Sequence, residues 1–106
     1  MFFELRHYRV KPGQREQWVK FMDEVIIPFQ SSKGMVIVGS FTCETDADAY
    51  FWMRRFDSEE ERERLYKAVY ESDYWKNEVA PKVTDMIYRE KIVVTRIVPT
   101  AKSVIR

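Results

Sequence analysis

Residues 33–43, KGMVIVGSFTC, place apolar side chains on both faces of one predicted β-strand. Successive side chains of a strand point to opposite faces of the sheet. Ile37 and Phe41 would therefore share one face, and Val36 and Val38 would share the other. A strand with one solvated face alternates between apolar and polar residues, and this strand shows little alternation. The sheet that contains it is therefore expected to be covered on both sides.

Two further predicted strands have the same property. One of them is residues 49–57, in which Trp52 and Phe51 point to opposite faces. The other is residues 86–99, which is also apolar on both faces. An uncovered face of this kind exceeds the apolar patch that soluble monomers normally expose. A second copy of the chain is the simplest cover, and two sheets packed face to face about a two-fold axis would form a homodimer.

The sequence leaves open which face of each strand meets the second copy. Either Val38 and Ile92 or their neighbours Ile37 and Val93 would form the contact. A lysine at the contact positions is expected to weaken assembly, because it would bring a charge into an apolar interface.

The period of the apolar residues distinguishes helices from strands along the chain. Residues 2–10 are rich in aromatic and β-branched residues and predict a strand. Residues 14–31 predict a helix with one apolar stripe, formed by Trp18, Phe21, Met22, Val25, Ile26 and Phe29. Pro28 lacks a backbone N–H, so this helix is expected to kink or end near Ile27.

The middle of the chain predicts a hairpin followed by a second helix. Strands at residues 35–44 and 49–57 are separated by the short polar turn ETDAD, as in a β-hairpin. Ser58 and Glu61 have the spacing of a capping box, in which each side chain satisfies a free backbone N–H at the start of a helix. A helix is therefore expected to begin at Ser58.

The last third of the chain completes the pattern. A short helical segment is expected at residues 72–75, interrupted by Pro81, and residues 86–99 predict one long strand. The order strand, helix, strand, strand, helix, strand is the ferredoxin-like βαββαβ plan of the α+β class. We therefore expect one domain, residues 1–106, with a four-stranded antiparallel sheet and two helices on one face.

The charge and cysteine content exclude several classes of function. The chain has 18 basic and 17 acidic residues, which gives no broad positive surface for nucleic acid or for an anionic membrane. Cys43 is the single cysteine and cannot form an internal disulfide. No signal peptide and no apolar run long enough to span a bilayer are recognised. We expect a soluble, cytoplasmic protein without nucleic-acid or membrane partners.

Several short motifs resemble those of the NIPSNAP family, within the dimeric α/β-barrel superfamily. They are FFELRHYRVKPG at residues 2–13, VGSF at residues 38–41, FDSEEERERL at residues 56–65, and DYW at residues 73–75 followed by Pro81. Together they extend over nearly the whole chain. The resemblance implies a homodimer in which two sheets close into an α/β barrel.

The superfamily also suggests a range of activities. Some relatives are cofactor-independent monooxygenases of polycyclic phenols, some degrade heme, and some NIPSNAP proteins are thought to be non-catalytic scaffolds. Related chains often carry H-L-W-R-Y in the third strand, where this chain has Trp52-Met53-Arg54-Arg55-Phe56. The position of the family's histidine resembles Trp52, so chemistry that depends on that histidine is not expected here.

His7 is the single histidine and the one candidate for a catalytic proton acceptor. A structural role is the alternative, because no partner of a catalytic triad is visible in the sequence. No metal site is expected, since the spacings typical of His and Cys ligands are absent. No cofactor is expected either.

Arg54 and Arg55 are neighbours in a strand and therefore point to opposite faces, so one of them is expected in a buried layer. A buried arginine requires a carboxylate partner or a bound anion. Glu4, Glu44 and Glu90 are the candidate partners in an internal ion pair. The alternative is that Arg54 anchors a substrate.

A group of aromatic residues could form the core alone or line a pocket between sheet and helices. With Arg54 added, the candidate ligand-binding residues are Trp18, Tyr50, Trp52, Arg54, Trp75 and Tyr88. Two hypotheses of function follow. In the first, the pocket binds a small hydrophobic or aromatic molecule and the protein is a monooxygenase-like enzyme or binder. In the second, the chain is a dimeric scaffold or protein-interaction domain.

Overall fold

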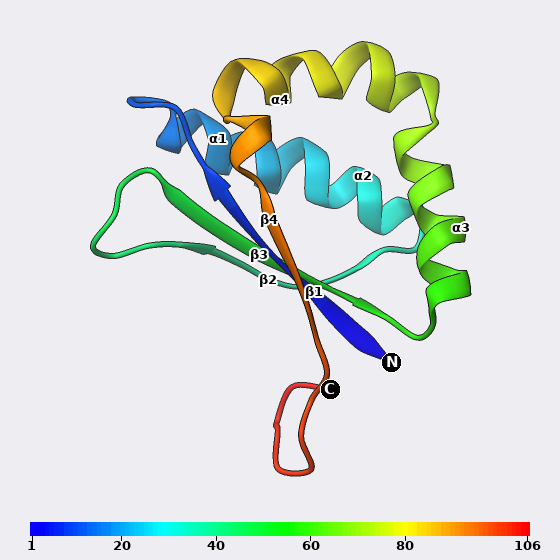
Figure 1. The fold of residues 1–106 in the computed structure, drawn as a ribbon. Helices are drawn as coiled ribbons and strands as arrows, with labels where there is room; N and C mark the ends of the chain where they lie inside the picture. Colours follow the sequence, from blue (N-terminus) through cyan, green and yellow to red (C-terminus); the bar gives the residue numbers. More distant parts are fainter.

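The computed structural model of the protein describes all residues, 1–106, and confirms the ferredoxin-like fold. Four antiparallel strands form one sheet in the order β2-β3-β1-β4 (Figure 1). Their bounds are Phe2–Arg9 for β1, Val36–Thr42 for β2, Ala49–Phe56 for β3 and Val93–Ile97 for β4. The two central strands, β1 and β3, pair along their full length from Phe2↔Phe56 to Arg9↔Ala49.

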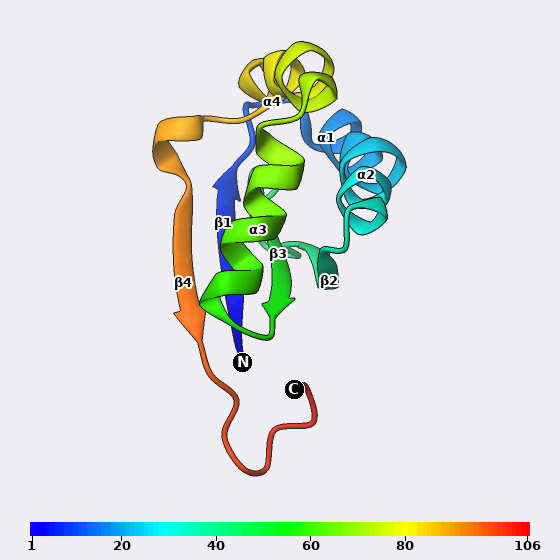
Figure 2. The ribbon, with the colours of Figure 1, turned by 90° about the vertical axis from the view of Figure 1, so that its right-hand side faces the viewer.

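All the long helices lie on one side of the sheet (Figure 1). The C-terminal segment lies on the other side, where Ser103 and Ile105 line a hollow together with Phe3 and Met53 of the sheet. The helix-facing side chains of β1 and β3 are the even-numbered ones, as strand geometry requires. They form the core together with the apolar stripes of the helices. Figure 2 shows the strands side by side, from β4 to β2, with α3 in front of them. The pocket described below lies in this layer between sheet and helices.

The first helical region is continuous from α1 (Arg15–Phe21) through the π-helical segment η1 (Met22–Ile26) into α2 (Ile27–Ser32). The helix does not end near Ile27, so that part of the expectation is wrong, but its geometry changes there from the π-helical η1 to α2. Pro28 occupies one of the first two positions of α2, where a backbone N–H is not needed for the regular α-helical pattern. The wider turn of η1 absorbs the change of hydrogen bonding, so the helix passes the proline without ending.

The second helical region begins with α3 (Glu59–Tyr70), and its predicted cap is confirmed. The Ser58 hydroxyl accepts a hydrogen bond of 3.0 Å from the backbone N–H of Glu61. In return, the Glu61 carboxylate accepts one from the backbone N–H of Asp57. These bonds fix where α3 starts, and therefore where its last turn, which carries Tyr70, meets the pocket.

The predicted interruption at Pro81 is wrong for the same reason as the one at Pro28. A second π-helical segment, η2 (Trp75–Val79), leads into α4 (Ala80–Met86), and Pro81 lies in the first turn of α4. This longer helical region positions Trp75 and Val83 over the sheet.

The last predicted strand, residues 86–99, is much shorter in the structure. Ile87 forms only an isolated bridge to Val10, and the 3-10 turn η3 (Arg89–Lys91) follows before β4. The register of β4 places Val93 opposite His7 and Val94 opposite Arg6. Because the chain turns at η3, Arg89 and Ile92 lie beside the pocket instead of within the sheet.

An irregularity in β2 changes the predicted assignment of its faces. The pairing with β3 shifts between Ile37 and Gly39. Ile37, opposite Arg54, therefore faces the helices, whereas Phe41, opposite Phe51, lies on the other face. The expectation that Ile37 and Phe41 share a face is wrong, because a bulge inserts one residue and reverses the alternation beyond it.

The face of the sheet that carries no helix is apolar and open. Odd-numbered residues of β1 and β3 form it, with side chains of the edge strands beside them. Phe41 is 52% exposed and Val93 is 54% exposed. We call this surface the open face; its apolar members are Leu5, Val36, Phe41, Phe51, Met53, Val93 and Ile97, together with Phe3, which is only 3% exposed.

None of the helices combines the length and the apolar composition needed to cross a lipid bilayer.

Candidate functional site

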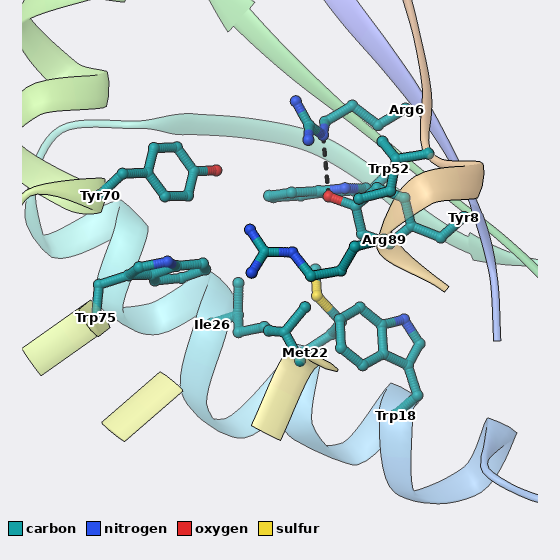
Figure 3. Close-up of a pocket in the computed structure, with 11 residues that line it drawn as sticks. Arg6, Tyr8, Trp18, Met22, Ile26, Trp52, Tyr70, Trp75 and Arg89 are labelled. Carbon is teal, nitrogen blue, oxygen red and sulfur yellow. Dashed lines mark hydrogen bonds between the residues drawn. The ribbon is translucent and has the colours of Figure 1, made fainter. Parts of the chain in front are cut away.

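A pocket lies between the sheet and the helices (Figure 3). Its cavity volume is about 70 Å³, and it is partly open to solvent. Most of the lining is aromatic or aliphatic, and all three tryptophans of the chain take part. The lining residues are Arg6, Tyr8, Trp18, Met22, Ile26, Trp52, Tyr70, Trp75, Val83, Arg89 and Ile92.

Regular secondary structure positions most of this lining. Arg6 and Tyr8 are successive helix-facing residues of β1. Trp18, Met22 and Ile26 follow one another at intervals of four residues along α1 and η1, and so lie on one face of the helical region. Tyr8 and the three helix residues belong to the buried core, whereas Arg6 is half-buried beside them.

The outer wall comes from segments near the ends of elements. Tyr70 is the last residue of α3, Trp75 is the first of η2, and Arg89 is the first of η3. The Tyr70 and Trp75 rings meet edge to face with centroids 4.8 Å apart. Figure 3 shows Arg89 extending from η3 toward these two rings.

Two arginines give the pocket its charge. The Nε of Arg6 donates a hydrogen bond of 2.9 Å to the Tyr8 hydroxyl, and its Nη1 donates one of 3.2 Å to the Tyr66 hydroxyl. Arg89 forms no salt bridge. The lining contains no aspartate or glutamate, so these two positive charges are not neutralised within it.

Polar donors without partners occur in the same wall. The indole N–H groups of Trp18 and Trp52 are buried and make no hydrogen bond. Burial raises the pKa of Tyr8, so its phenol stays neutral at physiological pH. The donors and the positive charge that the lining offers therefore come from Arg6 and Arg89, and the lining has no carboxylate or imidazole that would accept a proton.

Beside the pocket, Arg54 lies in a fully buried polar cluster. Its Nη2 is 2.9 Å from a carboxylate oxygen of Glu4 and 2.7 Å from the Tyr66 hydroxyl. Its Nη1 is 2.8 Å from the amide oxygen of Gln30 and 2.8 Å from the Tyr70 hydroxyl. The structure thus contains the internal ion pair that the sequence suggested, with Glu4 as the partner.

Arg62 is a second cation bound to Glu4, on the solvent side. Its Nε donates a hydrogen bond of 2.6 Å to the second oxygen of that carboxylate. Burial raises the pKa of Glu4, but hydrogen bonds from Tyr66 and Arg62 outweigh burial and leave the pKa below its ordinary value. The pKa of the Tyr66 phenol is shifted in the opposite direction, because burial raises it to about 12. Glu4 is therefore ionised and Tyr66 is neutral near pH 7.

The structure brings together only part of the predicted ligand-binding set. Trp18, Trp52 and Trp75 line the pocket. The Arg54 guanidinium lies over the Trp52 ring, 4.6 Å from its centroid. Its N–H groups donate hydrogen bonds to Gln30 and Glu4, and it does not line the cavity. Arg54 therefore supports the pocket wall from behind.

The two predicted tyrosines lie elsewhere. Tyr50 is buried in the core against Trp18, and its hydroxyl is hydrogen-bonded to Ser40. Tyr88 is half-buried outside the pocket, and the ammonium groups of Lys11 and Lys91 approach its ring. Neither side chain lines the pocket.

His7 lies on the open face and not among the lining residues. Its ring stacks on Phe51 with centroids 4.4 Å apart, and its Nε2 is buried without a hydrogen-bond partner. An odd-numbered position in β1 points away from the helices, so the sheet itself separates His7 from the pocket.

Sequence reasoning missed Arg6, Tyr8, Tyr70 and Arg89. Residues 2–8 carried a usable signal, since Glu4, Arg6 and Tyr8 alternate with apolar residues and so share one face. No signal identified Arg89, because residues 86–99 have the composition of a continuous strand.

Comparison with known proteins agrees with this architecture. The family model described as NIPSNAP matches residues 3–102. A NIPSNAP family protein of unknown function from Agrobacterium tumefaciens is 24% identical, and the match covers 100% of this chain and 94% of that chain with a TM-score of 0.89. No curated protein matches the sequence.

More distant structures share the fold alone. An antibiotic biosynthesis monooxygenase is 9% identical, with 94% of this chain and 99% of that chain covered at a TM-score of 0.69. A protein from an uncultured marine organism, described as dimeric and ferredoxin-like, is 14% identical, with 98% and 99% covered at a TM-score of 0.67. The family match extends over nearly the whole chain, from β1 to the C-terminal segment, and this chain therefore belongs to the NIPSNAP family.

Proposed function

We propose that this protein binds a small aromatic molecule in the pocket between sheet and helices. The observation that carries the proposal is the convergence of all three tryptophans on one partly open cavity. Concave, mostly apolar sites with a few polar groups are the usual form of small-molecule sites. A core built only for stability would be expected to close this space, because protein interiors pack to high density.

The proposal is tested by isothermal titration calorimetry with phenol, benzamide and benzoate. At least one of these single-ring compounds is expected to bind at millimolar concentration or below. Ile92 lies half-buried beside the cavity, so Ile92→Phe should reduce the affinity at least tenfold by filling it. Val104→Phe, in the exposed C-terminal segment, is the control and should leave binding unchanged. Binding by none of the three compounds would refute the proposal.

We further propose that the protein is a homodimer in which the open faces of two copies pack together. The support is the apolar character of that face and the exposure of Phe41 and Val93 on it, since soluble proteins seldom leave a large apolar patch in water. A structural relative described as dimeric and ferredoxin-like is consistent with the proposal. In this arrangement each subunit keeps its own pocket, because the pockets lie on the far side of the sheets.

Cofactor-independent oxidation of the bound molecule is the second candidate function. Its support is the likeness of fold to an antibiotic biosynthesis monooxygenase. The lining has no carboxylate or imidazole, so a phenolic substrate would have to bind already ionised and itself supply electrons to dioxygen. Uptake of dioxygen with an electron-rich phenol would favour the enzyme. Ligand binding without dioxygen uptake would favour a binding protein without catalysis. The absence of both ligand binding and dioxygen uptake would favour a dimeric scaffold.

A further inference from the structure

We propose that the ligand of this pocket is a single-ring aromatic carboxylate, with its carboxylate bound by Arg6 and Arg89. This inference rests on the proposed function and adds the charge and the size of the ligand. Three observations support it: the charges in the lining, the free donors of the two arginines, and the volume of the cavity.

The charge balance of the region leaves Arg6 without a carboxylate. The nearest buried carboxylate, Glu4, already receives hydrogen bonds from Arg54 and Arg62. The protein partners of Arg6 are two neutral hydroxyls, which use two of its five N–H groups. A guanidinium partly removed from water is stabilised by an anion, and a bound carboxylate would provide one.

Arg89 provides the second cation at the open side. It forms no ion pair, its side chain is exposed, and it reaches from η3 toward Tyr70 and Trp75 (Figure 3). The planar fork of an arginine matches the two oxygens of a carboxylate. Two such groups in one lining, with no acidic residue among them, favour an anion over a neutral molecule.

The cavity volume limits the rest of the ligand. About 70 Å³ is available, whereas a cavity of roughly 150 Å³ is known to hold benzene. A single ring therefore occupies the whole cavity and extends into its mouth, between Tyr70 and Arg89. A two-ring compound would have to displace core residues such as Trp18 or Ile26, which are almost completely buried.

The experiment compares the affinities of four probes by calorimetry. Benzoate is the expected ligand, benzamide has the same shape without the charge, acetate has the charge without the ring, and 1-naphthoate adds a second ring. Benzoate is expected to bind at least about tenfold more tightly than benzamide, because charge-assisted hydrogen bonds are roughly twice as strong as neutral ones. Acetate buries no ring and 1-naphthoate exceeds the cavity, so each should also bind at least about tenfold more weakly than benzoate.

The outcomes separate failure of the carboxylate or of the size limit from failure of the proposed function. Equal affinity for benzamide and benzoate would overturn the proposal that the ligand carries a carboxylate, but would leave the proposed aromatic pocket intact. Equal affinity for acetate and benzoate would overturn the proposal that the ligand contains an aromatic ring and, with it, the proposed function. Equal or tighter binding of 1-naphthoate would overturn the size limit. No binding by any probe would overturn both proposals.

Two variants test the arginines themselves. Arg89→Gln should lower the affinity for benzoate at least about tenfold and leave that for benzamide unchanged. The matched control is Arg64→Gln, which removes the same charge from an exposed position of α3 without a salt bridge. Arg6→Gln should act as Arg89→Gln does, and circular dichroism checks that it remains folded. Equal effects of Arg64→Gln and Arg89→Gln on benzoate would overturn the assignment.

Discussion

At the scale of single residues, Glu4 holds the buried charges together. Its carboxylate accepts hydrogen bonds from Arg54, Arg62 and Tyr66, while its side chain is only 1% exposed. A buried ion pair contributes little net stability compared with an apolar pair of the same volume, but loss of one partner leaves an uncompensated charge. The sheet position of Glu4, opposite Arg54, makes the two side chains dependent on each other.

Glu4→Gln is expected to lower the free energy of unfolding by about 3–5 kcal/mol, because Arg54 would remain buried without a counter-charge. Urea denaturation at one fixed protein concentration measures the loss. Glu59→Gln is the control, since that carboxylate pairs with Arg62 and Arg96 at the surface and its loss should cost less than about 1 kcal/mol. Similar losses for both variants would contradict this role of Glu4.

The same residue predicts a dependence on acid. The lowered pKa of Glu4 means that its contribution is fully present above the pKa of the unfolded chain and is lost as pH falls through the folded-state value. The stability difference between the wild-type protein and Glu4→Gln should therefore be constant near neutral pH and should shrink in acid, below about pH 4.3. Urea denaturation across this range checks it, and a difference that grew in acid would contradict the assigned sign.

At the scale of elements, the two helical regions are extended by π-helical segments that precede prolines. Both η1 and η2 lead into short α-helices that have proline in their first turn. Each region thereby spans the sheet and carries its pocket residues, Met22 and Ile26 in one case and Trp75 in the other. The start of α3, by contrast, is fixed by local side-chain bonds.

Ser58→Ala should lower the free energy of unfolding by about 1 kcal/mol, because it removes the hydroxyl that accepts the N–H of Glu61. Ser31→Ala is the matched control: Ser31 is an exposed residue of α2 that makes no cap, and alanine favours helix. Thermal unfolding of both variants at equal concentration makes the comparison. A control that lost as much stability as Ser58→Ala would show that the cap is not responsible.

At the scale of the whole molecule, the sheet divides two surfaces with different expected roles. One face carries the helices (Figure 1) and the pocket, and the other is the open face. Neighbouring residues of β4 illustrate the division. Val93 is paired with His7 on the open face, and Val94 is paired with Arg6 on the helix side.

Val93→Lys should raise the dissociation constant of the proposed dimer at least about tenfold, because an unpaired ammonium would be buried in the interface. Val94→Lys is a closely matched control, since Val93 is 54% exposed and Val94 is 43% exposed in the same strand. Sedimentation equilibrium over a range of concentrations measures both. A monomer at high concentration for the wild-type protein would refute the dimer, and equal effects of the two lysines would refute the choice of face.

The sequence by itself determined the order of elements, the cap of α3 and the apolar character of both sheet faces. These features depend on local periodicity and on residues close together in the chain, such as Ser58 and Glu61. It also identified three pocket residues, Trp18, Trp52 and Trp75, as members of a larger aromatic set. The dimer and the ligand remain predictions.

Only the tertiary structure decided which of the predicted aromatic residues line the pocket and which lie in the core. A bulge reversed the faces of β2 after Ile37, and a 3-10 turn took Arg89 out of the expected strand. Glu4 became the partner of Arg54 only through the pairing of β1 with β3, fifty residues apart. Such contacts depend on register and packing between distant segments, which one-dimensional periodicity does not encode.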